Sequence, residues 1–262
     1  MTKKAFILFA LPILLTACGN TESKKSVNSN GQAIDSAYYH KEKDAMSCTV
    51  RASLPAERLN QSVGEWLDEA LGGQYTGDPT DIQGIVDFYG MAMTDSLEKM
   101  LSNKDEVAED AEMAYEARME HCYETGELVT YTLSTFIDLG GAHPLSTAEG
   151  ATFRKKDGRR VGWDIIARHS QYLFLEKLKE QLKAYFEVET DEELAETTML
   201  DVEHIPLPKT PPYFTEDGIR AVYQEYEIAA YAYGMPEIQF TYDELKPLLT
   251  GWAQRLIKQE QP

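Results

Sequence analysis

The chain has 262 residues, of which 43% are hydrophobic, and its 44 acidic and 25 basic residues give a formal charge of −19. This apolar content suffices for one sizeable core or two small ones and excludes a chain that is disordered throughout, while the acidity argues against nucleic acid as a partner. Three cysteines are too few for a disulfide framework or a multi-zinc module, and no apolar run reaches the ~18–20 residues of a membrane-spanning helix.

The first residues are typical of an export signal. Lys3 and Lys4 precede an apolar stretch, 5–15, and the run Leu15-Thr16-Ala17-Cys18 follows. A positive segment, a short apolar segment and small residues before a cleavage point describe a secretory signal peptide. Because the run also resembles a bacterial lipobox, we predict a signal peptide over 1–17 and lipidation of Cys18. The alternative is an ordinary signal peptide with a chance cysteine.

Lipidation has consequences for location and charge. Several acyl chains hold a protein firmly on a bilayer, so we expect a lipid-anchored protein of the bacterial cell envelope, on the outer membrane rather than the inner. Residues 18–37 are rich in Ser, Asn, Lys and Gln and predict a flexible tether. Loss of 1–17 removes two lysines and changes the net charge from −19 to −21.

The two remaining cysteines form an even pair. Cys48 and Cys122 would lie in a compartment where disulfides persist. We therefore predict a Cys48–Cys122 disulfide in preference to two free thiols.

The folded part is expected from Tyr38. Periodicity and turn signals predict, in the first half of the chain, a strand over 46–54, a helix over 59–71, a helix from Asp78-Pro79 to 101, an ambiguous segment over 105–123 and a strand over 128–137. A hairpin of 151–153 with 161–163, a helix over 175–186 and an extended connection over 206–212 follow. The chain is then predicted to form strands over 221–228 and 238–240 and a last helix that begins at the capping pair Thr241 and Glu244 and restarts at Pro247. The acidic run 187–196 lacks the spacing of a calcium loop and predicts a solvated face.

Strands and helices are mixed without regular alternation, which predicts the α+β class. We expect helices with antiparallel sheet in two small packed subdomains. The first is an N-terminal α/β subdomain over 38–125, and the second is a C-terminal α+β domain over 126–262.

Two segments carry a family resemblance. One is Gly140-Gly141-Ala142-His143, and the other is Tyr226-Glu227-Ile228-Ala229-Ala230-Tyr231-Ala232 with the residues that follow it. Their order and spacing, over about 128–250, resemble the RsiV-like C-terminal domain family, a domain of unknown function found in bacterial envelopes. Its best understood relative is an anti-sigma factor whose extracellular part binds lysozyme. Ala230 stands where the family usually has proline, before a loop that lies near the partner in that relative.

These segments supply a candidate ligand or partner surface, made of Gly140, Gly141, His143, Tyr226, Tyr231 and Tyr233. For Gly140 and Gly141 a backbone turn that needs positive φ is favoured over a loop that approaches a ligand closely. His143 is a general base or metal ligand on one interpretation and a structural residue on the other. The tyrosines suit either a binding surface or a half-buried strand.

The resemblance favours a non-enzymatic binding module for a protein, such as lysozyme or another basic protein, or for a cell-wall glycan. The alternatives are an enzyme that acts on peptidoglycan or another glycan through His143 and nearby carboxylates, and a structural envelope protein. No H-E-x-x-H or G-x-S-x-G pattern is present. We therefore predict no catalytic residue, metal or cofactor.

Overall fold

The computed structural model describes residues 26–27, 33–34, 36–103, 111–198, 200–201 and 204–258. The predicted signal peptide and Cys18 lie outside these residues, and the predicted tether is described only in part. Within that part, β1 (Ser26–Val27) pairs with β2 (Ala33–Ile34), and Ser36 already begins a strand of the main sheet. None of the helices in the described residues is long and apolar enough to cross a membrane.

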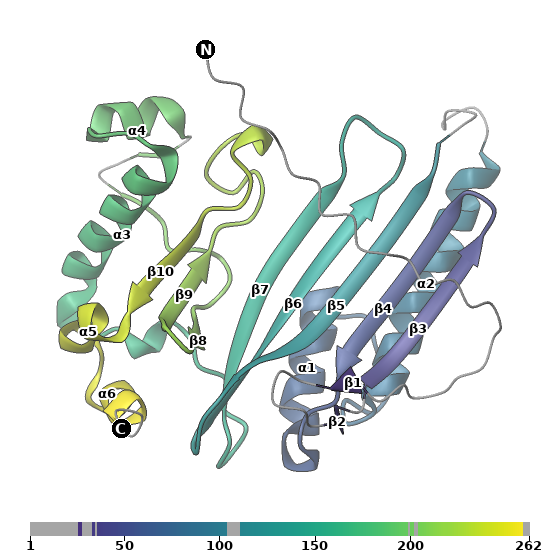
Figure 1. Cartoon of the computed structure of the whole chain (residues 1–262), viewed down its shortest axis with the longest axis horizontal. Helices are drawn as coiled ribbons and strands as arrows, with labels where there is room; N and C mark the ends of the chain where they lie inside the picture. The colour runs from purple at the N-terminus through teal and green to yellow at the C-terminus, as the bar shows by residue number, and fades with distance from the viewer. Residues whose placement is uncertain are drawn as a thin grey trace.

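The α+β prediction is confirmed, and the larger of two main sheets has five strands (Figure 1). They run in the order β3 (Ser36–Lys43), β4 (Met46–Ser53), β5 (Met113–Glu124), β6 (Leu128–Asp138) and β7 (Leu145–Arg154). All neighbours are antiparallel except β4 and β5. A parallel pair needs a crossover, and α1 (Asn60–Leu71) and α2 (Ile82–Ser102) supply it on one face of the sheet.

One face of β4 is buried beneath the helical layer. Met46, Cys48, Val50 and Ala52 alternate as buried residues along β4, which is the period-2 pattern of a strand with one covered face. The helix α2 begins later than predicted, because Asp81 rather than Asp78 accepts the capping hydrogen bond, from the Gly84 N–H.

The smaller sheet has the order β10 (Glu237–Thr241), β9 (Gly218–Val222) and β8 (Tyr213–Thr215), all antiparallel. Helices α3 (Gln171–Phe186) and α4 (Asp191–Thr197) lie beside it, and α5 (Tyr242–Leu245) and α6 (Gly251–Lys258) end the chain (Figure 1). The predicted capping box of Thr241 and Glu244 is confirmed. Phe174 of α3 packs on Phe240 of β10 at 5.4 Å between ring centroids.

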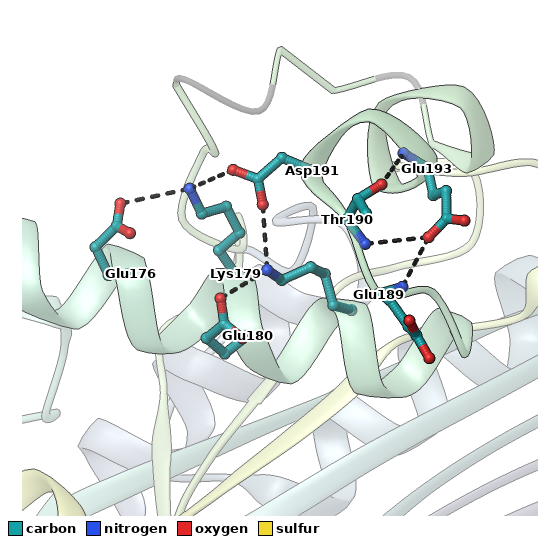
Figure 2. Close-up of polar contacts among 8 residues, drawn as sticks. Glu176, Lys179, Glu180, Glu189, Thr190, Asp191 and Glu193 are labelled. Carbon is teal, nitrogen blue, oxygen red and sulfur yellow. Dashed lines mark hydrogen bonds and ion pairs between the residues drawn. The ribbon is translucent and has the colours of Figure 1, made fainter.

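Ion pairs attach α4 to α3 (Figure 2). The carboxylate of Asp191 accepts hydrogen bonds from the Nζ atoms of Lys179 at 2.9 Å and Lys183 at 3.2 Å. These lysines lower the pKa of Asp191. Thr190 and Glu193 close a capping box at the start of α4. The prediction of a solvated face over 187–196 is therefore incomplete, because part of this run is paired internally.

The two sheets meet where β8 crosses β7. Gly150 of β7 faces the ring of Tyr213, and a Cβ placed on Gly150 would lie 2.3 Å from the Tyr213 Cγ. Next to it, the Phe214 N–H donates to the buried Oγ1 of Thr152 at 2.8 Å. The second sheet thus packs on the first through β7, and this contact fixes the position of the loop that joins β9 to β10.

The structure corrects the predicted division of the chain. The boundary at 125/126 falls in the turn between β5 and β6, which pair from Ala114 with Asp138 to Glu124 with Val129, with one bulge between His121 and Tyr123. Residues 128–154 therefore belong to the five-stranded sheet. The predicted hairpin of 151–153 with 161–163 is confirmed in part. The chain turns at Asp157-Gly158, Phe153 forms a bridge with Arg160, and the Val161 N–H donates to the Thr152 carbonyl at 2.8 Å, but no strand forms over 161–163.

The predicted Cys48–Cys122 disulfide is also wrong, since both thiols are free. The parallel register places Cys48 opposite Tyr115, so Cys122 lies seven residues further along β5. At a rise of about 3.3 Å per residue this separates the two Cα atoms by roughly 20 Å, whereas a disulfide needs about 4.4–6.8 Å. Cys48 is instead buried against α2, where its thiol donates to the Gly90 carbonyl.

Candidate functional site

The candidate surface forms where two loops meet at one end of β7 (Figure 1). The first loop joins β6 to β7, and the second joins β9 to β10. Gly140, in the first loop, has a φ of 70° and donates its N–H to Asp138 Oδ1 at 2.9 Å. A Cβ there would lie 2.7 Å from that of Ala111. The turn interpretation is therefore confirmed for Gly140, while Gly141 lies beside it without positive φ.

His143 of the first loop stacks on Tyr231 of the second. Their ring centroids are 3.8 Å apart with an interplanar angle of 18°. His143 Nδ1 lies 3.0 Å from the Pro144 carbonyl oxygen, which can only accept, so Nδ1 carries a proton. His143 Nε2 lies 3.0 Å from the Tyr226 hydroxyl, which donates to it in the neutral ring. Two loops distant in sequence are thus joined through one imidazole.

Tyr226 completes the group, which we call the aromatic surface (His143, Tyr226 and Tyr231). Its ring centroid lies 5.8 Å from that of Tyr231, and 49% of the residue is exposed. Tyr226 is not on a strand, because β9 ends at Val222, so the predicted strand over 221–228 is too long. It has a φ of 63°, a left-handed conformation that is uncommon for a residue with a Cβ.

A group of polar side chains, which we call the clamp (Gln224, Glu225 and Glu227), ties the second loop to β7. The Gln224 Oε1 accepts from the Ala148 N–H at 3.1 Å, and its Nε2 donates to the Ala148 carbonyl at 2.8 Å. The Glu225 Oε2 accepts from the Ser146 N–H at 3.1 Å. These contacts satisfy backbone groups on the outer edge of β7, which is the last strand in the order of the five-stranded sheet.

Glu227 holds the other side of Tyr226. Its Oε2 accepts from the Gln224 N–H and its Oε1 from the Lys209 N–H, both at 2.8 Å. Gln224 and Glu225 had no sequence signal of their own, because their partners on β7 lie 76 to 79 residues away, whereas Glu227 belongs to the run that carries the family resemblance.

Tyr233 lies apart from the aromatic surface. Its ring packs edge-on against Phe186 at 5.4 Å, and its carbonyl accepts from the Tyr185 hydroxyl at 2.7 Å. The structure therefore brings together His143, Tyr226 and Tyr231 but not the third predicted tyrosine. Ala230, which replaces the family proline, has a φ of −66°, so its backbone keeps the angle that proline imposes.

Neither loop of the surface carries a basic side chain, and the second loop carries two carboxylates. No Lys or Arg occurs over 119–153 or over 221–245, the segments that supply both loops. Within the two loops themselves, 139–144 and 223–236, the carboxylates are Glu225 and Glu227, and Asp138 ends β6 directly before the first loop. Partial burial, and then the charges of Glu225 and Asp138, raise the pKa of the Tyr231 hydroxyl. An approaching cation therefore meets carboxylates together with exposed rings.

The geometry of His143 bears on the enzyme alternative. Its Nδ1 contacts the Pro144 carbonyl oxygen and its Nε2 contacts the Tyr226 hydroxyl, so neither hydrogen bond is to a carboxylate. Over the described ranges, no group of three or more His, Cys, Asp or Glu side chains could hold a metal ion. A depression of about 220 Å³ lies over α3 and β10. It is lined by Glu176, Lys177, Glu180, Gln181, Phe240 and Glu244, and so by none of the predicted site residues.

The fold and this surface describe an α+β protein with two sheets joined through β7. A family model described as "Protein of unknown function (DUF3298)" matches residues 164–243, which include β8, β9 and the loop that carries Tyr226 and Tyr231. The chain thus carries a DUF3298 match over its second sheet. No curated protein matches the sequence.

Two crystal structures are similar to the whole fold. A member of the DUF3298 family from Bacteroides fragilis NCTC 9343 has a TM-score of 0.62 and 18% identity, and the match covers 87% of this chain and 96% of that one. A DUF3298 family protein from Pseudomonas aeruginosa PAO1 has a TM-score of 0.57 and 14% identity, with 84% and 96% covered. At these identities the likeness shows the fold alone.

Proposed function

We propose that this protein is a lipid-anchored binding module of the bacterial cell envelope, without enzymatic activity, which recognises a protein or cell-wall ligand through the aromatic surface. The observation that carries the proposal is the stack of His143 on Tyr231, with Tyr226 bonded to the imidazole and half exposed. Rigid aromatic side chains bury large areas on contact and lose little conformational entropy, which is why they serve as anchors at interfaces.

The charge of the chain supports a basic protein, such as lysozyme, as the partner. The formal charge of −19 attracts a cationic protein over a distance. Near the surface, the absence of Lys and Arg from both loop segments removes local repulsion. Such complementarity raises the association rate and favours one class of partner, while the aromatic rings would supply contact area. The RsiV-like resemblance supports the same class of partner.

Titration with lysozyme in physiological salt tests this proposal. The full chain is titrated in parallel with lysozyme and with an equally basic control protein, and heat of binding is measured. We expect saturable binding of lysozyme and markedly weaker binding of the control, because screening at this ionic strength suppresses non-specific attraction between exposed charges. Equal binding of both proteins, or binding of neither, would contradict specific recognition of lysozyme.

A further inference from the structure

Tyr226 occupies a backbone conformation that needs support from its neighbours. Its φ of 63° lies in the left-handed region, where the side chain of an L-residue crowds its own backbone. Residues in such conformations persist only when the surrounding structure holds them, and they concentrate at functional sites. The same residue places its hydroxyl 3.0 Å from His143 Nε2. The support for Tyr226 therefore also decides whether the aromatic surface is assembled.

The clamp supplies that support from both sides. Before Tyr226, Gln224 makes two hydrogen bonds with the Ala148 backbone, and Glu225 accepts one from the Ser146 N–H. After Tyr226, Glu227 accepts from the backbone N–H groups of Gln224 and Lys209. Each contact joins a side chain to a backbone group. Gln224 and Glu225 therefore tie the loop to the edge of β7, and Glu227 ties it to Lys209, without any bond from the Tyr226 side chain itself.

We propose that Gln224, Glu225 and Glu227 are the positioning residues of the aromatic surface: they hold Tyr226 in its left-handed conformation and so keep the surface assembled before a partner arrives. This inference deepens the proposed function and rests on it only where binding is concerned. Preorganisation of this kind improves affinity, because the cost of ordering the loop is met during folding and not on association.

The other edge of the same sheet offers a matched control. Tyr38 lies on the edge strand β3. Its N–H donates to the Gln83 Oε1 at 3.1 Å, and its carbonyl accepts from the Gln83 Nε2 at 3.2 Å. This is the pair of hydrogen bonds that Gln224 makes with Ala148. Gln83 lies on α2, and its Nε2 also donates to Asp87 Oδ1 of the same helix at 2.8 Å. Removing either side chain therefore deletes the same pair of hydrogen bonds to an edge strand, and Gln83→Ala loses the bond to Asp87 in addition. Only Gln224 lies beside Tyr226 in the chain.

Nuclear magnetic resonance of His143 in the full chain tests the proposal. An imidazole stacked on Tyr231 has its ring protons shifted by the ring current of the tyrosine. We expect Gln224→Ala to move these signals towards the positions of a free histidine. We expect Gln83→Ala to leave them in place, although this variant, which also loses the bond to Asp87, should lose at least as much thermal stability. Unchanged His143 signals in Gln224→Ala would overturn the positioning role.

A second pair of variants protects the test against misfolding. Glu225→Gln keeps an oxygen that accepts from the Ser146 N–H and should retain the His143 shift, whereas Glu225→Ala should lose it; equal shifts in both would overturn the role of Glu225. In the binding measurement, we expect Gln224→Ala to weaken lysozyme binding about tenfold or more relative to Gln83→Ala. If the wild-type chain binds no lysozyme, the proposed partner fails, while the His143 signals still decide the positioning role.

Discussion

Replacing Gly150 by alanine should destabilise the protein by about 1–3 kcal/mol or more, because the added methyl group overpacks the junction of the two sheets. Its Cβ would lie 2.3 Å from the Tyr213 Cγ, and the ring is 5% exposed, so it has little room to move aside. A change of this size lowers the melting temperature by several degrees. Chemical denaturation, followed by circular dichroism, measures the loss.

Gly126→Ala is the matched control, because a Cβ on Gly126 meets nothing within 4 Å. It should leave stability nearly unchanged. Combining Gly150→Ala with Tyr213→Leu should cost less than the sum of the two single changes, since a smaller side chain opposite position 150 relieves the overlap. Additive losses in this double-mutant cycle, or a Gly150→Ala variant as stable as Gly126→Ala, would contradict the described junction.

Above pH 10 the protein should lose stability steeply through its buried tyrosines. Burial raises the pKa of Tyr213 and that of Tyr115 to about 12, and it raises those of Tyr131 and Tyr223 as well. In the unfolded chain these hydroxyls ionise near pH 10. Below that pH both states are protonated and full stability is present; as the pH rises towards the folded-state values, only the unfolded chain ionises, and stability falls. For Tyr213 alone, a pKa difference of about 2 corresponds to about 2.7 kcal/mol.

Tyrosinate absorbance and circular dichroism, recorded together during an alkaline titration, measure this effect. We expect the absorbance to rise in two phases, the second of which coincides with loss of the folded signal. Tyr131→Phe removes one of the buried hydroxyls and should move the second phase to higher pH. Complete ionisation while the circular dichroism stays native would show that these tyrosines are accessible in the folded state, contrary to the structure.

Local patterns in the sequence predicted much of the fold. The strand over 128–137 and the helix over 175–186 are β6 and most of α3, because alternation and helical spacing are properties of a short segment. The capping pair of Thr241 and Glu244 was predictable for the same reason, since its two residues bond each other's backbone within one turn.

The errors concern pairings between distant segments. Counting cysteines favoured a bond between Cys48 and Cys122, but the parallel register of β4 and β5 separates them along the sheet. The domain boundary at 125/126 followed a turn signal, yet that turn joins two strands of one sheet. Neither the register nor the order of strands is encoded in composition or local spacing.

The candidate site was predicted in part. His143 and Tyr226 are 83 residues apart, and their hydrogen bond depends on the seating of β8 across β7. Both segments carry the family resemblance, whereas the alternation of tyrosines predicted that Tyr226 lies on a strand, and that strand ends earlier, at Val222. Gln224 carried no signal, because a glutamine in a loop is unremarkable until its amide is seen to occupy a strand edge.

The affinity of Tyr226→Ala for lysozyme tests most directly whether the aromatic surface is the binding site. Tyr172→Ala is the matched control, because Tyr172 is 70% exposed at the start of α3 and takes no part in the surface. We expect Tyr226→Ala to bind at least about tenfold more weakly than the wild-type chain, as for an anchor residue of an interface, and Tyr172→Ala to bind as the wild type does. Undiminished binding by Tyr226→Ala would contradict the assignment of the surface.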